Sequence, residues 1–307
     1  ASGCTVTAIR VHGFDSGILA TASVCVVQSC YFMSNTEAGV HVKAGGARIL
    51  DNYFATNETG IYLEFGNTNS VLGNSIGVHP LTGSVNGNRR GVYIASDRNY
   101  IGGTVASNGN VISGNSLRGI EISWVSSSNS IRGNFIGTDA SGTAAVPNDV
   151  GIQIDGNDNT VGGIKSGSRN VVSGNRSYGI RMSSSTQPIV RNKIEGNFIG
   201  TDVTGSNALP NDVGIFLEET ACKSNAIGGS LESQRNVVSG NAGEGIYVNY
   251  APYNAIQGNY VGLDVSGRYD LGNGSHGVLV ENAWNSEVGG TNAGAGNVVS
   301  GNGGHGV

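Results

Sequence analysis

The chain has 307 residues, of which 51 are glycine and only 5 are proline, and it carries a formal net charge of −5 at pH 7. Proline is too scarce for a collagen-like chain, and no Gly-x-y period exists. The 17 Lys and Arg residues form no basic cluster, which argues against nucleic acid as a partner. No apolar run reaches about 18 residues, so the sequence predicts no membrane span.

Short strand patterns recur along the whole chain. In residues 1–66 a Gly-[Ile/Val]-x-apolar motif begins at Gly17, Gly39 and Gly60, which are 22 and 21 residues apart. In residues 67–307 each further copy also alternates apolar and variable residues, the period of a half-buried strand. These later copies begin at Gly91, Gly119, Gly151, Gly179, Gly214, Gly245 and Gly277.

The arrangement of these strands predicts an all-β solenoid. No helical period of useful length separates them, which argues against alternating strands and helices. Short strands joined by Gly, Asn, Asp and Ser turns, at a repeat of 20 to 30 residues, are typical of a coiled repeat protein. We therefore expect a parallel β-helix of roughly eleven coils, in which each strand pairs with its equivalent in the next coil.

A second motif, Asn-x-[Val/Ile/Lys]-x-Gly-Asn, separates the strands. Asn tolerates the left-handed backbone angles of a turn. Stacked Asn side chains can also hydrogen-bond to one another from coil to coil. We therefore expect the closing Asn residues to form one ladder, with Cys30 and Asn52 in the same position of the first coils. The closing residues are Asn115, Asn134, Asn175, Asn197, Asn241, Asn259 and Asn302.

Two kinds of insertion alternate between the coils of residues 67–307. One follows Gly-Gly, as at Gly162, and the other begins with Thr-Asp or Leu-Asp, as at Asp139. The repeating unit is therefore two coils of about 62 residues: Asn134 and Asn197 are 63 residues apart. Residues 1–66 form short regular coils. Since no linker interrupts the pattern, we expect residues 1–307 to form a single β-helix domain.

The motif arrays resemble a known group of proteins. Arrays of GNxIGTDxxG, NxIGG and RNVISGN are similar to those of large secreted bacterial and archaeal β-helix repeat proteins, and the resemblance covers about residues 67–307. It implies a right-handed parallel β-helix and a secreted or cell-surface location. The broader class includes pectate lyases, polygalacturonases, alginate epimerases, phage tailspikes and adhesins, so the fold alone does not assign a function.

The catalytic motifs of those enzymes are missing from this sequence. Of the polygalacturonase pattern only Gly304-His305-Gly306 is present, and His305 is most simply a turn residue. An epimerase-like Asp-Pro-His segment and the paired arginines of pectate lyases do not occur. We therefore assign no catalytic residue, and whether the protein is an enzyme stays open with a lean towards a non-enzyme.

Three aspartates recur once in every two-coil unit: Asp139, Asp202 and Asp264. A catalytic carboxylate pair should consist of two chemically unlike groups. An aspartate repeated at the start of a turn is better explained as a cap on the backbone of that turn. Calcium bound by these loops, or by the segment 155–159, is the alternative, and no other cofactor is expected.

The four cysteines fit no zinc or redox motif. Cys4 and Cys25 lie about one coil apart, so they are either bonded neighbours or small residues of an N-terminal core. The disulfide state of Cys30 and Cys222 stays open.

The variable position of the Gly-Ile-x-Ile strands is the best candidate for a ligand site, because it faces outward and the core does not constrain it. Aromatic rings beside hydrogen-bonding groups suit sugar rings, and a long flat sheet suits a polymer. The alternative is an ordinary solvated β-face on which aromatic ladders shield the sheet. The candidate glycan-binding residues are Tyr62, Glu64, Tyr93, Glu121, Gln153, Asp155 and Arg181.

Three functions remain open. A structural or adhesive surface protein is favoured, because the repeat is regular and the sequence stops inside another coil motif at Gly306 without a capping segment. Copies would then stack end to end, which makes the protein its own partner. The alternatives are a polysaccharide lyase, hydrolase or epimerase, and a non-catalytic glycan-binding module, both of which use the outward face.

Overall fold

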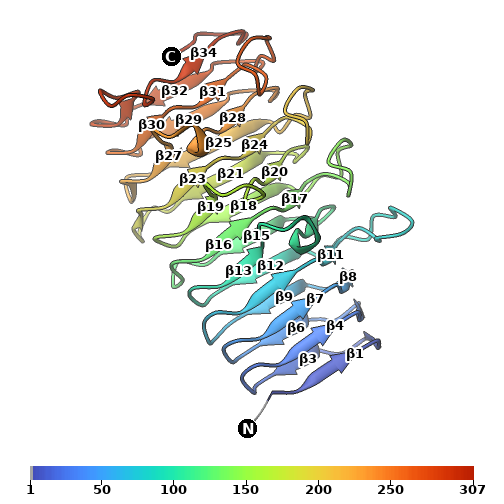
Figure 1. The fold of residues 1–307 in the computed structure, drawn as a ribbon. Helices are drawn as coiled ribbons and strands as arrows, with labels where there is room; N and C mark the ends of the chain where they lie inside the picture. The colour runs from blue at the N-terminus through green and yellow to red at the C-terminus, as the bar shows by residue number, and fades with distance from the viewer. Residues whose placement is uncertain (1–2) are drawn as a thin grey trace.

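The computed structural model describes residues 3–307, which form a rod of stacked coils with the two termini at opposite ends (Figure 1). Within this range three parallel sheets of 11, 11 and 10 strands run along the rod, and one further sheet has two strands. The prediction of an all-β parallel β-helix of roughly eleven coils is therefore confirmed. No helix in the described range is long and apolar enough to span a membrane.

Sheet A contains the first strand of each coil. Its strands pair in parallel at every step, for example Ile101 with Ile131 and Ile131 with Val161. Its members are β1 (Thr5–Thr7), β4 (Val26–Gln28), β7 (Arg48–Leu50), β10 (Ser70–Leu72), β13 (Tyr100–Gly102), β16 (Ser130–Arg132), β19 (Thr160–Gly162), β23 (Lys193–Glu195), β27 (Ala226–Gly228), β30 (Ala255–Gln257) and β33 (Glu287–Val288).

Sheet B contains the second strand of each coil and has the shortest strands. Its members are β2 (Arg10–His12), β5 (Tyr31–Met33), β8 (Tyr53–Ala55), β11 (Ser75–Ile76), β14 (Val111–Ile112), β17 (Phe135–Ile136), β20 (Val171–Val172), β24 (Phe198–Ile199), β28 (Val237–Val238), β31 (Tyr260–Val261) and β34 (Val298–Val299).

Sheet C contains the third strand, which includes the Gly-Ile-x-Ile motif. Its members are β3 (Ser16–Ala20), β6 (Ala38–Val42), β9 (Thr59–Leu63), β12 (Arg90–Ile94), β15 (Arg118–Ile122), β18 (Val150–Ile154), β21 (Tyr178–Ser183), β25 (Val213–Glu218), β29 (Ile246–Asn249) and β32 (Val278–Glu281). The two-stranded sheet joins β22 (Ile189–Val190) to β26 (Cys222–Lys223).

The core consists of the inward side chains of the three sheets. Ile120, Ile152 and Ile180 stack in register in sheet C and are fully buried. Burying one such side chain contributes about 2 to 3 kcal/mol. Because every coil supplies the same few apolar residues, the core continues along the rod as a column of small, similar layers.

Three ladders of asparagine side chains close the corners of the coil, so the expectation of a single ladder is wrong. In each ladder an Asn donates from its main-chain N and its Nδ2 to the Oδ1 of the Asn one coil later, as Asn134 does to Asn170. The sequence motif spans only one side of a coil, and its closing Asn therefore falls at alternating corners.

The ladder at the turn from sheet A to sheet B contains Asn52, Asn74, Asn110, Asn134, Asn170, Asn197, Asn236, Asn259 and Asn297. Cys30 donates its main-chain N–H to Asn52 Oδ1, which confirms that Cys30 and Asn52 share this position. The ladder from sheet B to sheet C contains Asn35, Asn57, Asn88, Asn115, Asn148, Asn175, Asn211, Asn241, Asn273 and Asn302. The ladder from sheet C to sheet A contains Asn69, Asn99, Asn129, Asn159, Asn192, Asn225 and Asn254.

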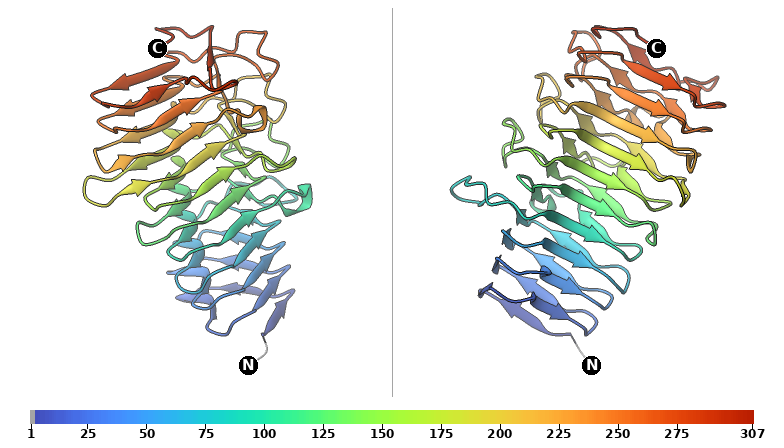
Figure 2. Two further views of the ribbon diagram at one scale, coloured as in Figure 1. Left: turned by 60° about the vertical axis from the view of Figure 1, so that its left-hand side comes forward. Right: turned by 180° about the vertical axis from the view of Figure 1, so that it is seen from behind.

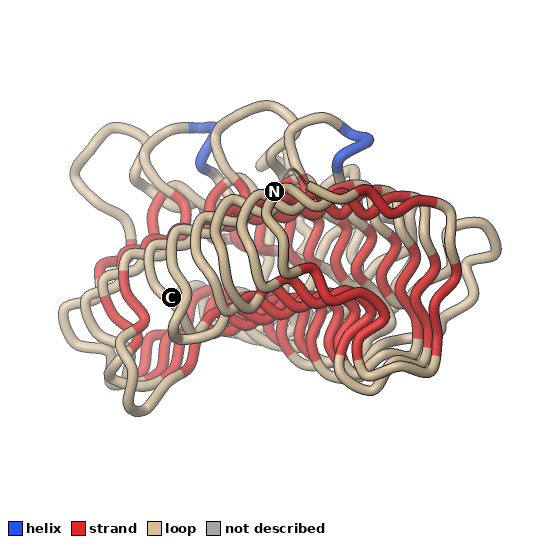
Figure 3. The backbone as a smooth tube through the Cα atoms, turned by 90° about the horizontal axis from the view of Figure 1, so that it is seen from below, coloured by secondary structure: helices blue, strands red, loops and turns tan. Residues whose placement is uncertain are grey.

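The insertions project from two edges of the rod, and most of them follow the plainer N-terminal coils in the chain (Figure 2). The aspartate loops follow sheet B, where an isolated bridge such as Thr138 with Ala145 closes each one. The Gly-Gly loops follow sheet A and stand in a row (Figure 3). Two of them contain short 3-10 helices, η1 (Ala106–Asn108) and η2 (Glu232–Gln234).

The four cysteines are free thiols in the structure. Cys4 accepts a main-chain hydrogen bond from Val26, 2.7 Å away, and therefore lies beside Cys25 in the next coil. A hydrogen bond with the Cys25 thiol raises the pKa of the Cys4 thiol. Of this pair only Cys25 is a core residue, because Cys4 is exposed; Cys30 and Cys222 are buried.

Candidate functional site

The outward face of sheet C brings most of the candidate residues into one row. Strand register aligns Tyr62, Tyr93, Glu121, Gln153 and Arg181 as successive neighbours along the rod. The other two candidates, Glu64 and Asp155, lie two residues further along their chains, where β9 and β18 have just ended. We call this surface the sheet C face.

Aromatic rings stack along the N-terminal half of this face. The ring of Tyr62 lies 4.4 Å from that of His41 and 5.0 Å from that of Tyr93, measured between centroids. Burial, and then the negative charge of Glu64, raise the pKa of the Tyr62 hydroxyl to about 12. Tyr62 therefore stays neutral and able to donate a hydrogen bond at any physiological pH.

A second aromatic stack continues the row towards the C-terminus. Phe216 lies 5.2 Å from Tyr178 and 4.9 Å from Tyr247, and Arg181 lies over the Tyr178 ring at 5.5 Å. None of these three rings was among the predicted site residues. Phe216 and Tyr247 occupy the same variable position of the motif, so the sequence does contain the signal for both.

A charged cluster lies between the two stacks. Arg90 Nε is 2.8 Å from Glu121 Oε2, and Arg118 contacts the other carboxylate oxygen. The two guanidinium groups therefore hold the Glu121 carboxylate fixed in position. Arg90 also lies over the Tyr93 ring, at 5.6 Å, and so joins the first stack to the cluster.

Sequence reasoning missed Arg90 and Arg118 because strict alternation places them on the inner side of the sheet. The glycine between Arg90 and the first inward residue breaks that alternation. A side chain at Gly91 would point inward, 2.8 Å from Ile112 Cγ2, while Val92 also points inward. Because Gly91 and Val92 both face inward, Arg90 faces outward again. Only glycine fits at position 91, where a side chain would be crowded.

Two polar atoms of the cluster have no hydrogen-bond partner in the described part of the chain: Gln153 Oε1 and Arg181 Nε. Gln153 is 2% exposed, and its Nε2 donates to Asp155 Oδ1 at 2.6 Å. Arg181 Nη2 lies 3.1 Å from Glu218 Oε2. Buried polar atoms are rarely left unpaired, so these two indicate where a water molecule or a ligand group binds.

Asp155 contributes a carboxyl group with a shifted pKa to the cluster. Burial raises this pKa, and the hydrogen bond from Gln153 together with nearby Arg118 offsets only part of that rise. A carboxyl group accepts hydrogen bonds when ionised and can donate one when protonated, so Asp155 can bind either kind of ligand group.

The sheet C face is less exposed than expected. Its side chains point outward, but they lie across one another, so that Glu121 is only 8% exposed. Access is widest at the turns that lead from sheet C to sheet A. There the rings of Phe65 and Trp124 project into solvent, each 57% exposed.

The repeated aspartates are bound by their own loops. Asp202 Oδ1 accepts main-chain hydrogen bonds from Thr204, Ser206 and Asn207, and Asp139 and Asp264 accept equivalent ones. Burial alone would raise the pKa of Asp202, but hydrogen bonds led by that of Asn207 outweigh it and lower the pKa. Residues 3–307 contain no group of three His, Cys, Asp or Glu residues placed to hold a metal ion.

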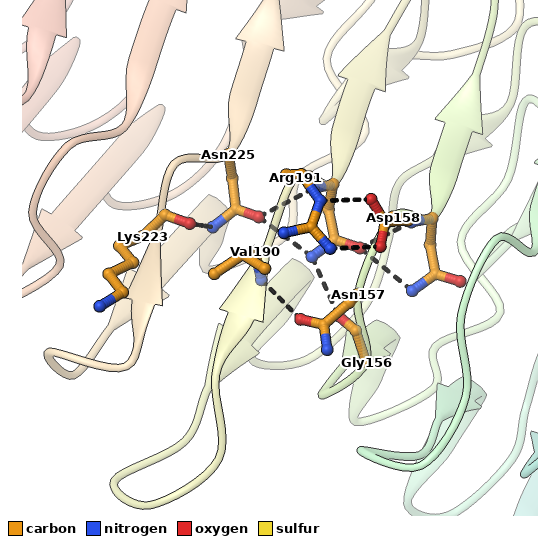
Figure 4. Close-up of polar contacts among 9 residues, drawn as sticks. Gly156, Asn157, Asp158, Val190, Arg191, Lys223 and Asn225 are labelled. Atoms are coloured by element: carbon orange, nitrogen blue, oxygen red, sulfur yellow. Dashed lines mark hydrogen bonds and ion pairs between the residues drawn. The ribbon is translucent and has the colours of Figure 1, made fainter.

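The segment 155–159 likewise uses its oxygens within the fold (Figure 4). Gly156 O accepts from Asn192 and Asn157 Oδ1 accepts from Val190. Asp158 makes two short contacts to Arg191, of 2.6 and 2.7 Å. A shallow cavity of about 470 Å³ lies beside this ion pair, on the sheet A side and away from the sheet C face.

Comparisons with known proteins agree with this architecture. A family model described as "Right handed beta helix region" matches residues 1–83, the part with the plainest coils. A comparison with curated protein sequences finds no match.

Among solved structures, the A-module of the mannuronan C-5 epimerase AlgE6 from Azotobacter vinelandii is 14% identical, with a TM-score of 0.53, and the match covers 98% of this chain and 91% of that one. The Dettilon tailspike protein is 16% identical, also with a TM-score of 0.53. That match covers 91% of this chain but 52% of the tailspike, so the chain spans about half its length. At such low identity these similarities establish the fold alone: the protein is a right-handed parallel β-helix.

Proposed function

We propose that the protein binds a polysaccharide along the sheet C face. The observation that carries this proposal is the row of stacked rings, which runs along the rod and leads directly into a charged cluster with unpaired buried polar atoms. Rings provide apolar surface for the faces of sugars, and the cluster provides donors and acceptors for their hydroxyl groups.

The dimensions of the face suit a chain rather than a single sugar. Each coil adds about 4.8 Å along the rod, so the four steps from Tyr62 to Arg181 cover about 19 Å. The similar structures include a tailspike and a mannuronan epimerase, and the latter by its name acts on a polysaccharide. That likeness supports the class of ligand but not a particular glycan.

Retention on immobilised polysaccharides tests the proposal. Neutral, uronic-acid and sulfated polymers would be compared by affinity electrophoresis, using the wild type, Tyr93→Ala and a control, Tyr269→Ala. Tyr269 is 72% exposed on an aspartate loop, away from sheet C. Loss of one ring contact costs about 1 kcal/mol, or about fivefold in affinity. Equal weakening by both variants, or no retention of the wild type by any polymer, would refute binding at this face.

The charged cluster could also act on the bound polysaccharide as a catalytic site, and this can be tested. In a polysaccharide lyase, hydrolase or epimerase, Asp155 would be the candidate proton-transfer group of the cluster, because burial beside these polar groups raises its pKa. Incubation with uronic-acid polymers should then give an unsaturated, shortened or epimerised product that Asp155→Asn no longer forms. If the polymers are not modified, the proposed function is binding without catalysis.

The second candidate is a structural role for the rod as an extracellular or surface protein that stacks end to end. The three asparagine ladders favour it, because the ladder from sheet B to sheet C ties each coil to the next from Asn35 to Asn302, and the other two add to it over much of the rod. Sedimentation velocity at increasing protein concentration would show growing species if copies stack. A single monomeric species at all concentrations would rule out stacking.

A further inference from the structure

Four Gly-Gly loops follow strands of sheet A, and they differ in their side chains. The loop of residues 163–169 follows β19, and its closest counterpart, residues 229–235, follows β27. Both lie in the row of loops along one edge of the rod (Figure 3). The counterpart serves as an internal reference for what each position normally does.

In the reference loop a pair of side chains fills the space beside the second glycine. Gln234 Nε2 donates to Glu195 Oε2 at 2.9 Å, and Gln234 Oε1 accepts from the main-chain N–H of Leu231 at 3.2 Å. Glu195 is the last residue of the preceding sheet A strand, β23. This loop is therefore satisfied by its own side chains.

At the loop 163–169, Ser168 corresponds to Gln234, and Arg132, the last residue of β16, corresponds to Glu195. These two residues form no such pair. Ser168 Oγ and Arg132 Nε are both buried, and neither has a hydrogen-bond partner in the described part of the chain. A methyl carbon placed at Gly163 would lie 3.4 Å from Ser168 Oγ and 3.5 Å from Arg132 Nε. Two donors without hydrogen-bond partners therefore both lie beside Gly163, which has no side chain.

The loop 163–169 is also the more basic of the two. Within residues 3–307 no carboxylate lies within 4.0 Å of the cationic groups of Arg132, Lys165 or Arg169. In the reference loop Leu231 replaces the lysine, and Arg235 is 3.6 Å from Glu232. Compared with the reference loop, the loop 163–169 therefore carries more positive charge that no carboxylate neutralises.

Arg169 shows that this charge is held in place rather than free in solvent. Its guanidinium lies 4.0 Å from the centre of the Phe198 ring, and its Nε donates to Gly196 O at 3.3 Å. Burial lowers the pKa of this guanidinium, since no carboxylate compensates for the lost water. The same stacking occurs between Arg235 and Tyr260, so the ring contact is structural and only the missing carboxylate is peculiar to Arg169.

We propose that the loop 163–169 binds a tetrahedral oxyanion, a sulfate or phosphate group that is either free or present as a monoester. A pocket of about 240 Å³ opens here, large enough for one such group. Arginine and lysine bind such oxyanions through strong charge-assisted hydrogen bonds. Gly163, Ile164, Lys165, Ser166, Gly167, Arg169, Gly196 and Ser233 line the pocket, so its side-chain donors are Lys165, Ser166, Arg169 and Ser233; Arg132 and Ser168 lie beside Gly163 and are not among the lining residues.

Two carboxylates adjoin lining residues in the sequence, and both have partners outside the pocket lining. Glu195, next to Gly196, accepts through its Oε2 from Gln234, and Glu232, next to Ser233, lies 3.6 Å from Arg235. The site lies on the sheet A edge, so it is independent of polysaccharide binding at the sheet C face.

Isothermal titration with sodium sulfate and sodium phosphate, at an ionic strength held constant with sodium chloride, tests the proposal. Lys165→Leu introduces the residue of the reference loop, and the double variant Arg132→Glu with Ser168→Gln introduces its filling pair, so both should keep the fold. Loss of one charge-assisted hydrogen bond should weaken binding at least about tenfold. The double variant should abolish binding.

The matched control is Lys223→Leu, which removes an exposed lysine of β26 and should bind like the wild type. Methyl phosphate and methyl sulfate are added in a second titration. Displacement of the inorganic ion by either monoester assigns the site to an ester, and failure to displace it assigns the site to the free ion. Binding no tighter than that of chloride, or equal losses in Lys165→Leu and Lys223→Leu, would overturn the proposal.

Discussion

Replacement of Asn134 by alanine should destabilise the protein more than most single substitutions on its surface or in its loops. Asn134 is 1% exposed. Its Nδ2 donates to Asn170 Oδ1, Ile101 O and Arg132 O at 3.0, 2.9 and 3.0 Å, and its Oδ1 accepts two bonds from Asn110 at 3.1 and 2.8 Å. Alanine removes all five.

The structure also sets the size of the effect. Each lost hydrogen bond costs roughly 1 kcal/mol, and buried partners left unpaired cost more, so Asn134→Ala should cost about 3 to 5 kcal/mol. Asn134→Asp should cost at least as much at neutral pH, because it keeps the two accepted bonds but turns an oxygen towards three acceptors. Urea denaturation followed by circular dichroism measures both.

Asn302 is the matched control because it occupies the corresponding position in another ladder but is only partly buried. Its Nδ2 donates to Val261 O and Ser300 O, and its Oδ1 accepts from Asn273. Water can replace these bonds, so Asn302→Ala should cost about 1 kcal/mol or less. Equal costs for Asn134→Ala and Asn302→Ala would refute the reasoning that buried ladder bonds stabilise the coils.

Three further predictions concern the core, an aspartate loop and the sheet C face. Ile131→Ala should cost about 2 to 5 kcal/mol in urea denaturation, because Ile131 is fully buried between Ile101 and Val161. The pKa of Asp202 is lowered in the folded state, so its contribution to stability is present above the ordinary pKa of about 3.9 and disappears as the pH falls through the lower folded value. Between neutral pH and about pH 3, Asp202→Asn should therefore lose less stability than the wild type. If the difference in unfolding free energy between the two proteins stays the same over this pH range, the reasoning is contradicted. In a spectrophotometric titration, Tyr62→Phe should remove a tyrosine ionisation near pH 12 and leave the titration at lower pH unaltered.

The architecture could be predicted because the same strand and turn motifs recur along the whole chain. Period-2 strands at regular spacing require a parallel solenoid, and even Cys30 was placed correctly beside Asn52 from its position in the motif. The number of ladders was not predictable from the motif alone, because Asn115 and Asn134 look identical in sequence yet lie at different corners.

The candidate site was harder to predict, for reasons that lie in side-chain length and local backbone. Alternation places Glu121 and Gln153 on the outer face, but it does not reveal that Arg90 and Arg118 contact Glu121. Arg90 was missed because Gly91 permits two successive inward positions. The loop at Gly163 was missed because its significance appears only when its unpaired donors are compared with the paired ones of its counterpart.

The asparagine ladders also have a direction. In every rung the donor belongs to the earlier coil and the acceptor to the later one, as for Asn110, Asn134 and Asn170. Successive peptide N–H groups of a strand point alternately towards the two neighbouring coils, so their dipoles along the rod largely cancel, whereas aligned side-chain amide dipoles add, as peptide dipoles do in a helix. The three ladders therefore give the rod a permanent electric dipole along its axis, positive towards the C-terminal end, and such a rod should orient in an applied electric field.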